Sequence, residues 1–137
     1  MSSGATPSWL ATVLREAGRL MVVALFWWDV VFLLIPDFAG TVSYISQRGL
    51  PFPNLLAIAV IVALLVLPAM LFFRKTEALG FIGLSLFCIL TAVLFHQYWK
   101  LEGFERTMEQ IHFMKNIALA GAMLMLTAQA IQRERDH

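Results

Sequence analysis

Four long apolar runs make up most of the chain, with polar residues gathered between them. The runs extend roughly over residues 20–35, 55–73, 78–95 and 113–131. A helix rises about 1.5 Å per residue, so each run is about long enough to cross a hydrocarbon core of roughly 30 Å. Within lipid a span must satisfy its backbone polar groups internally, which outside a closed barrel only a helix does. The pattern predicts an all-α integral membrane protein, an antiparallel four-helix transmembrane bundle.

Prolines, glycines and charged links set the predicted boundaries. We expect an N-terminal tail and interfacial segment over 1–18, a four-span membrane domain over 19–131 and a C-terminal tail over 132–137. The spans themselves are predicted at about 19–36, 54–73, 78–97 and 110–131.

Two helix starts have recognisable capping residues. Asn54 is predicted to cap the second span, because its side chain can accept a hydrogen bond from the first turn. Thr107, with Gln110 three residues later, predicts a capping box, so that the fourth helix starts before the membrane and projects outward.

Small residues predict where helices pack closely. In the third span they recur on one helical face, at Ala78, Ser85, Cys88 and Ala92. In the fourth span the corresponding pairs are Ala118 with Ala122 and Gly121 with Ala128.

Composition and charge narrow the possible partners. The 137 residues are 60% hydrophobic and carry a formal net charge of +1, with no basic patch of the kind that binds nucleic acid. Cys88 is the only cysteine, which excludes a disulfide within the chain, and its apolar surroundings indicate a core residue. The expected partners are membrane lipids and other integral membrane subunits.

The distribution of basic residues predicts the orientation. The side that holds both termini and the link between the second and third runs carries six of them, Arg15, Arg19, Arg74, Lys75, Arg133 and Arg135. The opposite side carries four, Arg48, Lys100, Arg106 and Lys115. The excess favours a multi-pass membrane protein with both termini in the cytoplasm.

Most of the candidate chemistry lies at the predicted outer ends of the spans. Asp29 is the exception, since it falls about 10 Å inside the outer end of the first span, where an unpaired carboxylate costs several kcal/mol. It is interpreted either as a proton-handling or ligand-binding acid, or as a bonded residue that fixes packing. The outer candidates form a rim above it, comprising Asp37, His96, Tyr98, His112, Lys115 and Asn116.

Each rim residue also has a structural interpretation. Tyr98 fits an interfacial aromatic belt, Lys115 could extend to the interface, and His96 could donate to a loop carbonyl. Alternatively, the histidines and Lys115 share the chemistry needed to hold a quinone oxygen or an anionic head group. Glu109 and His112 match one Glu-x-x-His element, which di-iron bundles need twice, so no metal site is predicted, and neither haem nor any covalently bound cofactor is expected.

The ordered segments resemble the DoxX family of four-span membrane proteins. The resemblance rests on residues 37–41 (DFAGT), Tyr44, residues 49–53 (GLPFP), 95–99 (FHQYW) and 112–116 (HFMKN), and it runs from about residue 19 to 128. It implies the four-span fold and an association with membrane redox complexes, since the family is named after a subunit of a thiosulfate:quinone oxidoreductase.

The chain also departs from the family pattern. Relatives often have a glutamate followed by paired glycines in the second helix, where this chain has apolar residues 63–68, and a lysine before the DFAGT segment, near Leu34 here. We therefore predict, first, a non-catalytic accessory subunit of a larger redox or energy-transducing complex. The alternative is a quinone-interacting redox subunit of the thiosulfate:quinone oxidoreductase type, in which His or Lys binds the carbonyl head group and Asp29 relays the proton.

Overall fold

The computed structural model describes residues 8–136, and the predicted tail over 1–7 lies outside this range. The described chain is helical, in the order α1 (Ser8–Trp28), η1 (Asp29–Leu34), α2 (Phe38–Gln47), α3 (Pro53–Met70), α4 (Glu77–Phe95), η2 (Tyr98–Lys100) and α5 (Gly103–Arg135). Four segments are long and apolar enough to cross a membrane: α1 with η1, then α3, α4 with η2, and α5. The predicted all-α membrane bundle is confirmed.

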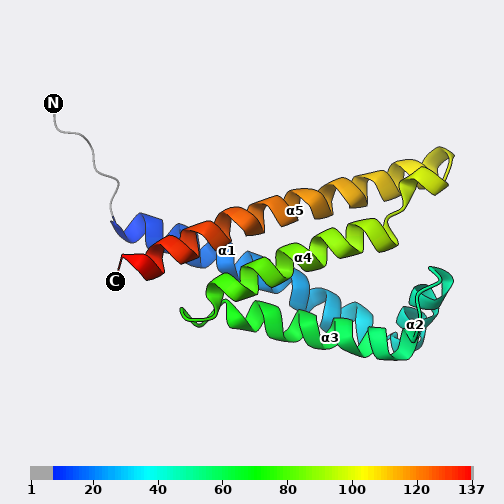
Figure 1. Cartoon of the computed structure of the whole chain (residues 1–137), viewed down its shortest axis with the longest axis horizontal. Coiled ribbons are helices and arrows are strands. Elements are labelled where there is room, and N and C mark those ends of the chain that lie inside the picture. The colour runs from blue at the N-terminus through cyan, green and yellow to red at the C-terminus, as the bar shows by residue number, and fades with distance from the viewer. Residues whose placement is uncertain (1–7, 137) are drawn as a thin grey trace.

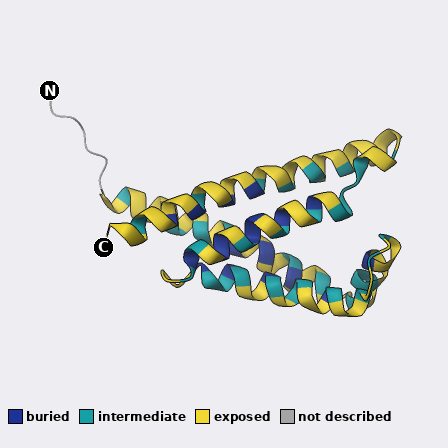
Figure 2. Ribbon diagram, viewed as in Figure 1, coloured by how far each residue is buried: buried dark blue, intermediate teal, exposed yellow. Residues whose placement is uncertain are grey.

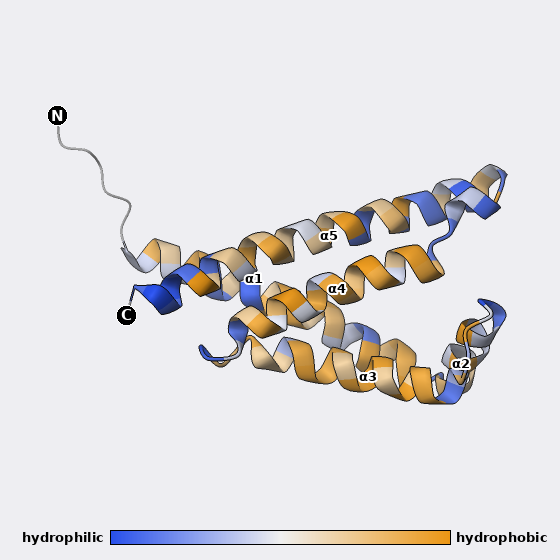
Figure 3. Ribbon diagram, in the orientation of Figure 1, coloured by the Kyte–Doolittle hydropathy of each residue, from blue (hydrophilic) through white to orange (hydrophobic). Residues whose placement is uncertain are grey.

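The two ends of the bundle differ (Figure 1). The start of α1, the end of α5 and the turn between α3 and α4 lie together at one end, here called the terminal end. The helix α2 and the connection between α4 and α5 lie at the opposite end, the loop end. Figure 3 shows apolar residues along the middle of the long helices and hydrophilic residues towards both ends, as a membrane-spanning bundle requires.

The helix α4 is central to the packing, and buried residues gather on it (Figure 2). Ser85, Cys88 and Ala92 are no more than 1% exposed, so the predicted close-packing face of this helix is confirmed. They allow α5 to approach closely enough for the Ser85 hydroxyl to donate to the Ala120 carbonyl oxygen at 3.0 Å.

The prediction for the packing face of α5 was wrong. Its buried residues are Ala120, Met123, Thr127 and Ala130, whereas Ala118, Gly121, Ala122 and Ala128 are exposed. Apolar residues surround this part of the helix, so small size alone does not identify the face that meets α4.

The predicted helix starts were also wrong. Phe52, not Asn54, precedes α3, and Pro53 takes the first helical position, where its fixed φ suits the helix and its missing N–H is not needed. The helix α5 begins at Gly103, and Thr107 lies one turn inside it, where its hydroxyl donates to the Gly103 carbonyl. The predicted interfacial segment up to residue 18 is part of one continuous helix, α1.

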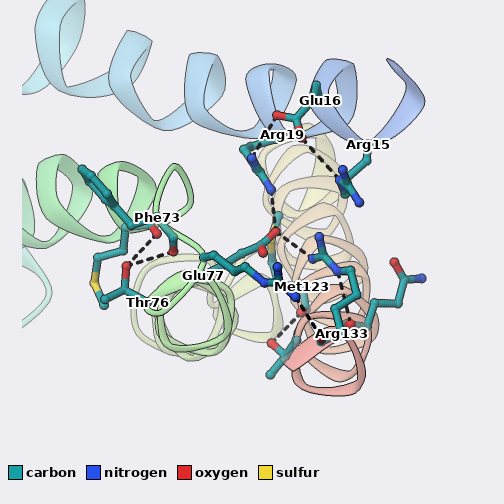
Figure 4. A network of polar contacts seen from close by, with 12 residues as sticks. Arg15, Glu16, Arg19, Phe73, Thr76, Glu77, Met123 and Arg133 are labelled. Carbon is teal, nitrogen blue, oxygen red and sulfur yellow. Dashed lines mark hydrogen bonds and ion pairs between the residues drawn. The ribbon is translucent and has the colours of Figure 1, made fainter. Parts of the chain in front are cut away.

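An ionic cluster joins three helices at the terminal end (Figure 4). Glu77, the first residue of α4, is 3% exposed, and its Oε1 accepts hydrogen bonds from Arg19 of α1 at 2.7 Å and from Arg133 of α5 at 2.9 Å. Arg19 also donates to Glu16 at 2.9 Å. Glu77 follows the short link between the second and third runs, and its role in joining α1, α4 and α5 has no local sequence signal.

Replacing Glu77 by glutamine should destabilise the bundle, because the substitution leaves Arg133 without a counter-charge and leaves the largely buried Arg19 paired only with the half-exposed Glu16. We expect a loss of about 3 kcal/mol in the free energy of unfolding, measured by denaturant titration of the protein in detergent. The matched control is Glu16→Gln, whose side chain is 45% exposed and which should change the stability by no more than about 0.5 kcal/mol. Equal effects of the two variants would show that the Glu77 cluster does not hold the bundle.

Gly80→Ala should also destabilise, because α4 approaches the end of α3 closely at Gly80. An added Cβ would lie 2.8 Å from Leu71 Cδ2 and 2.9 Å from the Leu67 carbonyl oxygen. Overpacking of this kind costs about 1–3 kcal/mol, which the same titration would measure. Gly121→Ala is the control, since nothing lies within 4 Å of its added Cβ, and it should be neutral or slightly stabilising.

Candidate functional site

A cavity of about 690 Å³ opens in the loop-end half of the bundle. Its walls come from α1, η1, α2, α3, α4 and α5, so it forms only when the whole fold is assembled. Much of the wall is aromatic or aliphatic, and Phe26 of α1 meets Phe87 of α4 edge to face there, with ring centroids 6.4 Å apart. An apolar cavity of this size with a few polar groups is typical of a small-molecule site.

Six of the seven predicted site residues line this cavity: Asp29, Asp37, His96, His112, Lys115 and Asn116. They come from η1, the start of α2, the end of α4 and one face of α5. Tyr98 is not among the lining residues. Its ring packs edge to face on Trp99 and Phe113, with centroids 5.4 Å away in both cases, which agrees with the aromatic-belt interpretation.

His96 is the most firmly oriented of the polar groups. It is the residue at which α4 ends, and its Nδ1 lies 2.7 Å from Glu109 Oε2 on α5. A carboxylate only accepts hydrogen bonds, so Nδ1 carries the proton in this pair and, in the neutral ring, Nε2 is an acceptor. The His96 ring also stacks on His112, with centroids 5.3 Å apart. Two residues one turn apart on α5 therefore hold the imidazole in place.

Further contacts connect Glu109 to the segment after α2. Arg48 approaches Glu109 at 4.0 Å, and its guanidinium donates to the Tyr44 hydroxyl at 3.1 Å. The Tyr44 ring stacks on Phe95, with centroids 5.5 Å apart. These contacts connect α2 to α4 and α5 over the loop end, and they set the position of the carboxylate that orients His96.

Asp29 lies deeper in the cavity than this rim. It is half-buried and begins the π-helical segment η1, in which the amide of Ile35 bonds to the Val30 carbonyl five residues earlier. Within residues 8–136 no side-chain hydrogen bond reaches its carboxyl group. A π-helical turn is rare and is often found at functional sites.

Asp37 has a structural task. Its carboxylate accepts a hydrogen bond from the Gly40 amide at 3.0 Å and so caps α2. A Cβ at Gly40 would collide with that carboxylate, which explains the glycine in the DFAGT segment. The capping role accounts for Asp37 at the cavity edge without any ligand.

Lys115 supplies a positive charge on the α5 side of the cavity. It lies between His112 and Asn116 on one helical face, three residues from the first and one from the second. Within the described residues its ammonium group forms no ion pair and no hydrogen bond to a side chain or carbonyl. Across residues 8–136, no three His, Cys, Asp or Glu side chains gather closely enough to hold a metal ion.

Comparison with known proteins agrees with this architecture. The family model for DoxX matches residues 14–97, which is more than half of the chain. The chain belongs to the DoxX family. The DoxX match includes Asp29, Asp37 and His96, whereas the α5 residues of the cavity follow its last matched residue.

A curated relative extends the similarity beyond residue 97. The inner membrane protein YphA of Escherichia coli strain K12 is 36% identical over 121 residues, which cover 83% of this DoxX chain and 81% of the relative. No solved structure matches the chain. The comparisons therefore establish a small DoxX-family membrane protein, and the chemistry of its cavity has to be argued from the residues.

Sequence analysis missed the residues that connect the rim. Glu109 was seen only as half of a metal motif, and Arg48 only as a loop charge, although both position His96. The spacing of Glu109 and His112, one turn apart on α5, was the available signal. Nothing local in the sequence indicates that Arg48 reaches across the bundle.

Proposed function

We propose that this protein is a membrane subunit that binds a quinone head group in the loop-end cavity, within a larger redox assembly. The observation that carries the proposal is that an oriented imidazole, His96, and an unpaired ammonium group, Lys115, line the same apolar cavity. A quinone needs these elements, because its ring and tail are apolar while its two oxygens require polar partners.

The side chains divide the chemistry between them. The Lys115 ammonium can donate to a carbonyl oxygen of the oxidised ring. The His96 Nε2 can accept a hydrogen bond from a hydroxyl of the reduced ring, because Glu109 keeps the proton on Nδ1. Asp29, deeper in the cavity, is placed to accept a proton passed from the ring. The electrons are assigned to a partner subunit of the oxidoreductase class, which supplies or receives them as the ring changes its redox state.

The proposal includes the membrane and the orientation of the protein in it. We assign the protein to a bacterial-type inner membrane with both termini in the cytoplasm, so that the cavity lies in the outer half of the bilayer. The relative YphA is described as an inner membrane protein, and six basic residues on the terminal side against four on the loop side support the orientation.

Lys115→Met should weaken quinone binding. The substitution keeps the apolar length of the side chain and removes a charged donor, which is worth about 1.5–3 kcal/mol, or roughly 10- to 100-fold in Kd. The measurement is quenching of tryptophan fluorescence by a short-chain ubiquinone, with the purified protein in nanodiscs of phosphatidylcholine. Lys100→Met is the matched control, since Lys100 is an exposed residue of η2 outside the cavity lining.

A second variant tests the proton-handling groups. Asp29→Asn combined with His96→Ala should reduce affinity for the reduced ring more than for the oxidised ring, because His96→Ala removes an acceptor and Asp29→Asn removes the carboxylate that can take a proton. Affinity that is unchanged in this variant and in Lys115→Met would rule out quinone binding in the cavity.

A purely structural role in the assembly is the second candidate, and an exposed aromatic pair favours it. Trp28 and Phe32 are 59% and 57% exposed, and their rings stack with centroids 4.3 Å apart. Trp28 lies outside the cavity lining, whereas Phe32 also lines the loop-end cavity. Exposed, ordered aromatic rings of this kind are typical anchors of a protein interface.

Trp28→Ala with Phe32→Ala should therefore release the protein from its native assembly, as judged by co-purification in mild detergent. Leu86→Ala with Leu90→Ala is the control, because both leucines are similarly exposed on α4. Retention of all partners by the aromatic variant would count against an interface on this face.

A further inference from the structure

A second cavity, of about 330 Å³, lies at the terminal end, and it is separate from the site proposed above. Its lining is polar and strongly basic. Four arginines and two glutamates contribute, which leaves two positive charges in excess: Arg15, Arg19, Arg74, Arg133, Glu16 and Glu77. Such an excess at the end of a membrane span attracts anions.

The guanidinium groups retain hydrogen-bonding capacity after all their contacts within the protein are made. Each carries five N–H donors. Arg15 gives only Nε to Glu16, at 3.3 Å, and Arg74 gives Nη2 to the Arg133 carbonyl oxygen at 3.0 Å. The Nε of Arg19 is fully buried and has no hydrogen-bond partner among the described residues.

The carboxylates do not use up this capacity. Glu77 is already held through one oxygen by Arg19 and Arg133, and Glu16 is shared between Arg15 and Arg19. The donors left over are mainly those of Arg15 and Arg74, which flank the cavity from α1 and from the turn after α3. Planar guanidinium groups that line one cavity suit a phosphate, whose oxygens accept paired hydrogen bonds.

We propose that this cavity binds the phosphate group of an anionic phospholipid at the terminal end of the bundle. A lipid is favoured over a free phosphate because the cavity lies where α3 ends and α4 begins, at the edge of two spans. Phe72, which is 45% exposed, also lines it and offers an apolar contact for the glycerol and upper acyl chain. Basic pockets at the ends of membrane helices bind phospholipid head groups through the same chemistry.

The experiment compares two double variants of the full-length protein. Arg15→Gln with Arg74→Gln removes two positive charges and their forked guanidinium donors, and it leaves the Glu77 cluster intact. Lys75→Gln with Arg135→Gln removes the same charge from exposed positions at the same end of the bundle but outside the cavity lining. Native mass spectrometry of each protein, released from phosphatidylcholine nanodiscs containing phosphatidylglycerol, measures the retained lipid. Unfolding midpoints in pure phosphatidylcholine show that both variants fold.

We expect the wild-type protein to retain phosphatidylglycerol, and the cavity variant to bind it about 30-fold more weakly, which corresponds to about 2 kcal/mol for two arginines. The control variant should bind within about threefold of the wild type. An equal loss in both variants would indicate diffuse attraction to the basic end, and an equal retention would show that the cavity is not used. Either result overturns the proposal.

A test with inorganic phosphate shows whether the phosphate group in the cavity belongs to a lipid or to a free ion. With pure phosphatidylcholine nanodiscs, added phosphate should leave the unfolding midpoint unchanged, because a free anion lacks the apolar contact at Phe72. A rise that disappears in the cavity variant would overturn the lipid as the occupant and identify a site for free phosphate instead.

Discussion

The buried carboxylate of Glu77 determines how the helices of this bundle converge. Lipid is as apolar as the side chains it surrounds, so helices in a membrane associate through close packing and polar contacts rather than through the hydrophobic effect. A buried carboxylate is costly unless it is paired. Its two guanidinium partners come from α1 and α5, and therefore these helices must meet α4 at the terminal end. The loop-end cavity lies between this cluster and the polar contacts that connect α2 to α4 and α5.

Packing between α4 and α5 complements this constraint. The seam of Ser85, Cys88 and Ala92 against Ala120 keeps these two helices in contact along their length. No comparable seam of small residues joins α1 to α4 in the described chain, where bulky rings such as Phe26 and Phe87 meet instead. At the loop end the helices are connected by side-chain contacts from α2 and its following turn. The cavity thus lies between these loop-end contacts and the Glu77 cluster at the terminal end.

The sequence predicted what depends on composition and local pattern. The lengths of the apolar runs predicted the four spans. The spacing of Ser85, Cys88 and Ala92 predicted the packing face of α4. The same reasoning failed for α5, where Gly121 and Ala122 face outward. It also failed for Glu77 and Arg48, since a charge next to a turn has the same local signature whether it meets solvent or a helix more than fifty residues away. Six of the seven proposed site residues share a cavity because five of them lie near span ends on one side and Asp29 lies within the same half of the first span, whereas the Tyr98 ring packs on Trp99 and Phe113.

Glu109 has two structural roles. A substitution that is meant to test ligand binding in the cavity is therefore better made at another residue. Its carboxylate orients His96 and also meets Arg48, so it holds the rim together while it sets the tautomer of the imidazole. A change at Glu109 would alter both the shape of the rim and the acceptor that faces the cavity, and neither effect could be isolated. Lys115 carries no such structural contact within residues 8–136. Its charge can be removed while the rim stays in place, and the response of a bound ligand then reports the chemistry of the cavity itself.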